Sequence, residues 1–96
     1  MQSGAAETAE PLMRGALDMR RACLSPNDIH IASAVSNLGE CLATLGRAEE
    51  AEPLLLQAVT DLDGAEDASI DWKSQARDRL VKFYEQTGRP EQAAKY

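Results

Sequence analysis

A stretch of this chain recurs 42 residues further on, and this repeat constrains the fold more than any other feature. Residues 9–12 read Ala-Glu-Pro-Leu, and residues 51–54 read the same. At the same offset, residues 46–51 match residues 88–93, and residues 4–9 match both segments more weakly. Such self-similarity in one register indicates a repeat protein, in which each unit packs mainly against its neighbours.

Each copy predicts two helices joined by a turn at a glycine. Between residues 30 and 45 the apolar side chains are spaced three and four apart, which is the helical period. Gly46 follows as a stop signal, because a residue without Cβ turns the chain left-handed with little strain. Gly4 and Gly88 stand at the equivalent positions. We expect helices at about 5–23, 30–45, 48–62, 70–87 and 90–96.

Two prolines fall inside these predicted helices. Pro11 and Pro53 occupy equivalent positions in the second helices of the first two copies. Because proline has no N–H to donate, a helix tolerates it best in the first turn. We therefore expect both helices to begin a few residues before the repeated motif, with each proline near the end of the first turn.

The 96 residues form a single domain, 1–96, in this interpretation. The first copy supplies only a second helix (5–23), the middle copy is complete (28–62), and the last copy is partial (70–96). Linkers are expected over residues 24–28 and 63–69. The chain is too short for a complete TIM barrel or another large enzyme fold. We predict an all-α fold, a short right-handed superhelix of antiparallel helix pairs.

The residues at the predicted helix–helix contacts resemble the tetratricopeptide repeat. The middle copy follows that pattern at Val35, Leu38, Gly39, Leu42, Gly46, Ala51, Leu55 and Ala58. Small side chains at Gly39, Ala51 and Ala58 would let paired helices approach closely. The last copy departs from the pattern at Val81, where the family has glycine, and at Arg77, where it has a bulky residue.

Two narrower resemblances concern the setting of the repeats. The 42-residue period and residues 24–32 are similar to the longer repeat variant of kinesin light chains. Residues 80–94 resemble the closing segment of repeat tails appended to bacterial Ser/Thr protein kinases. The sequence has no Gly-rich phosphate loop and no catalytic Asp motif, so the chemistry of such a kinase would lie outside it.

The resemblance implies a protein–protein interaction module that is not an enzyme. In this family the first helix of each repeat lines a concave groove that holds an extended peptide or a helix. The corresponding residues are Ser33, Ser36, Asn37, Glu40 and Thr44 in the middle copy, and Gln75, Asp78, Arg79, Lys82 and Gln86 in the last copy. We expect Asn37 to hydrogen-bond a peptide backbone, and Arg79 and Lys82 to pair with a carboxylate. The alternative is that these are ordinary exposed polar residues.

No constellation in the sequence indicates a catalytic site, a metal site or a cofactor. The two cysteines, Cys23 and Cys41, and the single histidine, His30, do not provide the ligand spacing of a zinc site or a disulfide framework. Cys41 falls on the apolar side of its helix and is expected in the core, and both thiols are expected to be reduced. His30 and Trp72 stand 42 residues apart and are expected to pack a linker against a helix.

The charge of the chain excludes some partners and favours others. A net charge of −6 argues against nucleic acid, whose binding needs a surplus of Lys and Arg. No apolar stretch is long enough to span a membrane and the first residues do not resemble a signal peptide, so we expect a cytoplasmic location. Residues 1–71 carry a charge of −9 and residues 72–96 carry +3, which favours capture of an acidic segment or head-to-tail association.

Three functions stay open on these observations. The first is a module that binds a protein or peptide partner in the concave groove. The second is self-association into a homo-oligomer through the N-terminal helix (5–23), which lacks its partner helix in the repeat. The third is the regulatory C-terminal tail of a bacterial Ser/Thr protein kinase.

Overall fold

The computed structural model describes residues 3–25, 28–66 and 68–96, with side chains from residue 6 onward. Within that part of the chain every regular element is a helix, so the all-α prediction is confirmed. The helices are α1 (Ser3–Cys23), α2 (Ile29–Thr44), α3 (Ala48–Asp63), α4 (Ile70–Gln86) and α5 (Pro90–Ala93). Pro26, Asn27 and Asp67, which belong to the predicted linkers, lie outside the described residues. The right-handed sense of the superhelix stays a prediction.

Side-chain caps set the first residues of α2 and α4. The carboxylate of Asp28 accepts a hydrogen bond from the backbone N–H of His30 at 2.8 Å. The hydroxyl of Ser69 accepts one from the backbone N–H of Trp72 at 3.1 Å. Each bond satisfies a donor that has no acceptor within its own helix, which is why the helices begin at these residues.

The glycine turns at the ends of α2 and α4 are confirmed. Gly46 has φ = 78° and Gly88 has φ = 74°, the left-handed region that favours glycine. After Gly46, the N–H of Arg47 returns to the carbonyl of Leu42 at 2.9 Å. After Gly88, the N–H of Arg89 returns to the carbonyl of residue 84 at 2.7 Å. The two repeats therefore end their first helices with the same capping motif, and the second helix of each pair folds back along the first.

The expected positions of Pro11, Pro53 and Gly4 were wrong. Pro11 lies in the third turn of α1, which begins at Ser3, two residues earlier than expected. Pro53 lies in the second turn of α3, which begins at Ala48 as expected, so the proline falls just beyond the first turn. Both prolines are exposed, so the helix carbonyls that lose their N–H partner can be hydrated. Gly4 lies within α1 and does not form a turn.

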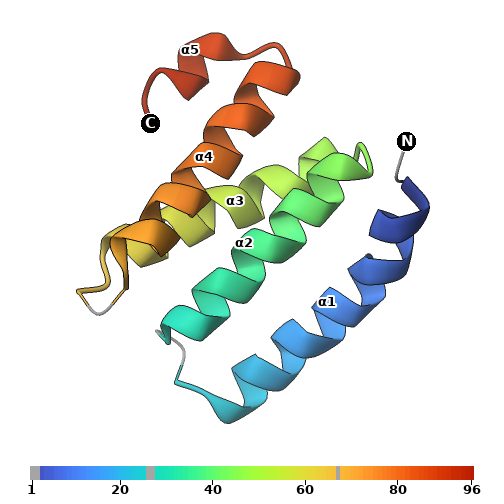
Figure 1. Ribbon diagram of the computed structural model, residues 1–96, viewed down its shortest axis with the longest axis vertical. Coiled ribbons are helices and arrows are strands. Elements are labelled where there is room, and N and C mark those ends of the chain that lie inside the picture. The colour runs from blue at the N-terminus through green and yellow to red at the C-terminus, as the bar shows by residue number, and fades with distance from the viewer. Residues whose placement is uncertain (1–2, 26–27, 67) are drawn as a thin grey trace.

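The core lies around α2, which packs against α1, α3 and α4 (Figure 1). The largest fully buried side chains are Val35, Leu38, Leu42, Leu55, Leu62 and Leu80. Gly39 explains the close approach of α2 to α3, because a Cβ there would lie 2.9 Å from Cγ and Cδ2 of Leu55. Ala51 and Ala58 on α3 are fully buried. The predicted role of these small residues in helix packing is confirmed.

Candidate functional site

The candidate groove runs between α2 and α4, which lie side by side in Figure 1. It contains two adjoining hollows. The larger, about 470 Å³, is lined by Glu40, Asp71, Ser74, Gln75, Asp78, Arg79 and Lys82. The smaller, about 190 Å³, is lined by Glu40, Ala43, Thr44, Leu55, Arg79, Lys82, Phe83 and Gln86. Glu40, Arg79 and Lys82 border both hollows, so the two form one continuous surface.

Most residues predicted for the groove line these hollows, and three lie elsewhere. Asn37 lines a third hollow of about 250 Å³ between α1 and α2. Ser33 is half-buried, and Ser36 is buried with only 3% of its surface exposed. Neither serine borders the hollows described above. The hydroxyl of Ser36 accepts a hydrogen bond from Arg79, and contact of either serine with a ligand stays a prediction.

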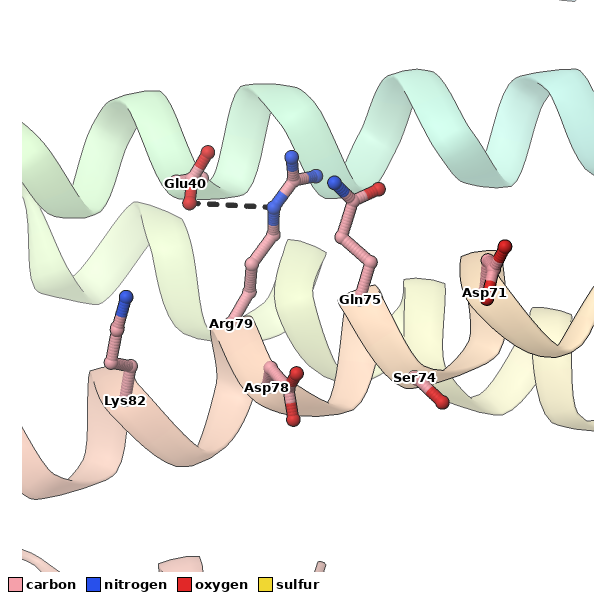
Figure 2. Close-up of a pocket in the computed structure, with 7 residues that line it drawn as sticks. All are labelled: Glu40, Asp71, Ser74, Gln75, Asp78, Arg79 and Lys82. Atoms are coloured by element: carbon pink, nitrogen blue, oxygen red, sulfur yellow. Dashed lines mark ion pairs between the residues drawn. The ribbon is translucent and has the colours of Figure 1, made fainter.

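The side chain of Arg79 is bound to α2. Its Nη1 donates to Oγ of Ser36 at 2.9 Å and to Oδ1 of Asn37 at 2.7 Å. Its Nε lies 3.4 Å from Oε2 of Glu40, the ion pair drawn in Figure 2. Only 14% of the side chain is exposed. We expected Arg79 to hold a ligand carboxylate, but its guanidinium joins α4 to α2, and Glu40 already supplies it with a carboxylate.

Lys82 is the exposed cation of this groove. It lies one turn beyond Arg79 on α4 and borders both hollows. In Figure 2 the side chain of Gln75 extends toward α2, whereas those of Ser74 and Asp78 point away from it. The groove therefore has Lys82 toward the C-terminal end of α4, Asp71 near the N-terminal end, and Asp78 between them, one turn before Lys82.

Asp71 and Ser74 line the larger hollow, and the sequence analysis did not name them. They precede Gln75 and Asp78 by four residues, so they lie on the same face of α4 one turn earlier. Extending the helical period toward the N-terminus of α4 would have found both.

The rings of His30 and Trp72 are in contact. Their centroids are 5.7 Å apart and the ring planes cross at 86°, an edge-to-face arrangement. Nδ1 of His30 lies 2.8 Å from a carboxylate oxygen of Asp28. The hydrogen bonds from the backbone N–H and the ring of His30 lower the pKa of the Asp28 carboxyl. The two rings thus join the first turns of α2 and α4, and their predicted role in packing a linker against a helix stays a prediction.

Both cysteines are free thiols in different surroundings. Cys41 is buried, and its Sγ donates to the backbone carbonyl of Ala6 at 3.2 Å. Burial raises the pKa of the Cys41 thiol. Cys23 is exposed. The placement of Cys41 in the core is confirmed. Among the described residues, no cluster of three or more His, Cys, Asp or Glu side chains could hold a metal ion.

The charge asymmetry between the two parts of the chain is largely used within the molecule. Three arginines of the basic C-terminal part form ion pairs with acidic residues of the preceding part. The pairs are Arg77–Asp63 at 2.6 Å, Arg79–Glu40 at 3.4 Å and Arg89–Glu52 at 3.0 Å. Residues 72–96 were expected to attract an acidic segment or a second copy. Because their arginines are paired within the molecule, the lysines carry the positive charge that remains for such a contact.

Comparison with known proteins bears on the family of the chain. A family model described as tetratricopeptide repeat matches residues 1–62, which cover α1, α2 and all but the last residue of α3. No curated protein and no solved structure matches the chain with significance. No helix in the described part of the chain is long and apolar enough to cross a membrane. Together with the paired helices and their glycine turns, the match shows that the chain belongs to the tetratricopeptide repeat family.

Proposed function

We propose that this chain is a protein-interaction module that binds an extended peptide segment along the groove between α2 and α4. Repeats of this family generally mediate protein–protein interactions and are typically not enzymes. The observation that carries the proposal is the continuity of the groove. Glu40 from one repeat and Arg79 and Lys82 from the next border both of its hollows.

The charges along the groove favour a peptide with both an acidic and a basic side chain. Arg79 is neutralised by Glu40, so Lys82 is the cation that would meet an acidic side chain of the ligand. Asp71 and Asp78 are exposed and would meet a basic side chain. On a helix, Asp71 and Lys82 are about 17 Å apart along the axis, which an extended peptide spans in about five residues.

A displayed peptide library tests this function. Peptides selected on the wild-type chain should be enriched in an acidic and a basic residue about five positions apart. Their affinity should fall at least about tenfold with Lys82→Glu, because the change sets a carboxylate against the acidic side chain of the peptide. Lys95→Glu makes the same change of charge at an exposed residue outside the groove and should change affinity less than about twofold.

Amide chemical shifts locate the bound peptide independently of these variants. Shifts concentrated on Glu40, Thr44, Gln75, Lys82 and Gln86 would support the groove. Peptides that bind Lys82→Glu as well as they bind the wild type, with shifts confined to other helices, would contradict it.

A further inference from the structure

A second, uncharged surface lies on α1, on the side that faces away from α2. It is defined here as the α1 stripe and consists of Ala9, Leu12, Gly15, Ala16, Met19 and Cys23. These residues recur at intervals of three and four, so they share one face of the helix. Ala9 is half-buried and the others are exposed. Among the charged residues of α1, Arg20 borders this face, and its Nη1 donates to the backbone carbonyl of His30 on α2 at 2.8 Å.

Two of the four large apolar side chains that are exposed in the described part of the chain lie on the stripe. Leu12 is 71% exposed and Met19 is 68% exposed. Burial of such side chains releases about 25 cal/mol per Å² of apolar surface removed from water. Leu12 and Met19 lie two turns apart on this face, so one helix packed along the stripe would bury both.

In α3, which is the helix equivalent to α1, the residues that correspond to part of the stripe are covered by another helix. Ala16 and Ala9 correspond to Ala58 and Ala51 of α3, which are fully buried beneath α2. Figure 1 shows that α1 has α2 on one side and no helix on the other. An additional helix in contact with α1 would complete the packing that α2 provides for α3.

The other end of the molecule does not fit the stripe. A head-to-tail contact would place α1 of one copy against the outer face of α4. There Lys73 and Arg77 stand where α2 has the buried Ile31 and Val35. Arg77 is also held by its ion pair with Asp63. A charged face covers a charge-free stripe poorly, because its charges would lose water without gaining partners.

We propose that the α1 stripe is the contact surface of a symmetric dimer, in which α1 of a second copy packs antiparallel against it. The stripe is complementary to itself, since large and small side chains alternate along it and the charge that borders it, Arg20, is bound to α2. A two-fold axis beside residue 14 sets Leu12 against the partner's Ala16, and Met19 against the partner's Ala9. The antiparallel arrangement also aligns the helix dipoles favourably. This proposal is independent of the peptide-binding groove.

Sedimentation equilibrium of the full chain tests the dimer. The apparent mass should rise from 10.4 kDa toward twice that value as concentration increases through the high micromolar range. Leu12→Glu and Met19→Glu should each weaken the dimer at least about tenfold. Both side chains are exposed, so helicity measured by circular dichroism should not change. Ile70→Glu is the matched control, because Ile70 is 80% exposed and lies on α4, and it should leave the dimer intact.

Disulfide cross-linking tests the orientation of the helices. Copies carrying Leu12→Cys should cross-link to copies carrying Ala16→Cys faster than either variant cross-links to itself, in a Cys23→Ser background. In the native chain Cys23 lies near the end of α1, so an antiparallel pair keeps the two thiols far apart. Rapid formation of a Cys23–Cys23 disulfide would indicate a parallel pair and overturn the proposed geometry. A monomeric mass at every concentration would overturn the dimer.

Discussion

Arg79 and Asn37 occupy the same position in successive repeats, and Nη1 of the arginine donates to Oδ1 of the asparagine at 2.7 Å. The two residues are 42 positions apart, which is the length of the repeat. The same arginine also binds Ser36, whose hydroxyl is buried. The α2–α4 contact that forms the candidate groove is therefore held by a polar cluster as well as by the apolar core.

Replacement of Arg79 by alanine should destabilise the chain. Without the guanidinium, the buried hydroxyl of Ser36 loses its hydrogen-bond partner, and we expect the free energy of unfolding to fall by about 1–3 kcal/mol. Lys82→Ala, one turn further on an exposed position, should change it by less than about 0.5 kcal/mol. Urea denaturation followed by circular dichroism measures both values. Equal effects of the two substitutions would show that the cluster does not stabilise the α2–α4 contact.

Gly39→Ala should be destabilising although alanine favours helices. The added Cβ would lie 2.9 Å from Cγ and Cδ2 of Leu55, so α2 and α3 would have to separate or Leu55 would have to move. We expect a loss of about 1–3 kcal/mol in the free energy of unfolding. In a Leu55→Val background the loss should be smaller, because the shorter side chain leaves room for the Cβ.

Gly64→Ala is the control for that substitution. Gly64 has φ = −81°, which any residue adopts, and its Cβ would lie 3.5 Å from the carbonyl of Thr60, an ordinary contact. Its effect on the urea midpoint should be small in comparison. If Gly39→Ala unfolded at the same urea concentration as Gly64→Ala, the close approach of α2 to α3 would not limit that position.

The stability of the chain should fall at alkaline pH because of Tyr84. Burial and the hydrogen bond of its hydroxyl to Glu52 at 2.9 Å raise the pKa of Tyr84 to about 12. An unfolded tyrosine titrates near pH 10, so between about pH 10 and about pH 12 only the unfolded chain loses this proton. The stabilisation is therefore complete below about pH 10 and is lost as pH rises toward about 12.

Urea midpoints measured across this pH range test the effect. The wild type should lose stability more steeply than Tyr84→Phe, which has no proton to release at that position. Parallel curves for the two proteins would show that Tyr84 does not cause the loss.

The two cysteines should react with thiol reagents at very different rates. Cys23 is exposed, whereas Cys41 is buried and burial raises the pKa of its thiol, so less thiolate is present and access is restricted. In the native chain one thiol should be labelled quickly, and the second only at the rate of opening of the α1–α2 contact. Peptide mapping should assign the fast site to Cys23, and rapid labelling of Cys41 would contradict its place in the core.

The sequence was most informative where local rules decide the structure. The glycine turns at Gly46 and Gly88 followed from the need for a left-handed residue after each first helix. The close approach at Gly39 followed from the repeat pattern. Asp71 and Ser74 also lie on the face of α4 that the helical period defines, although the sequence analysis did not extend it that far. The function of the groove stays a prediction, because the fold alone identifies no ligand.

Tertiary structure decided the features that depend on contacts between helices. The sequence placed Arg79 on the groove, but only the distance between α2 and α4 determined that its guanidinium would bind Ser36, Asn37 and Glu40 within the chain. The start of α1 at Ser3, which places Pro11 in the third turn, was also not evident from the repeated motif. The repeat pattern thus determined which residues face a neighbouring helix. Which of those faces is covered depends on whether the neighbouring helix is present.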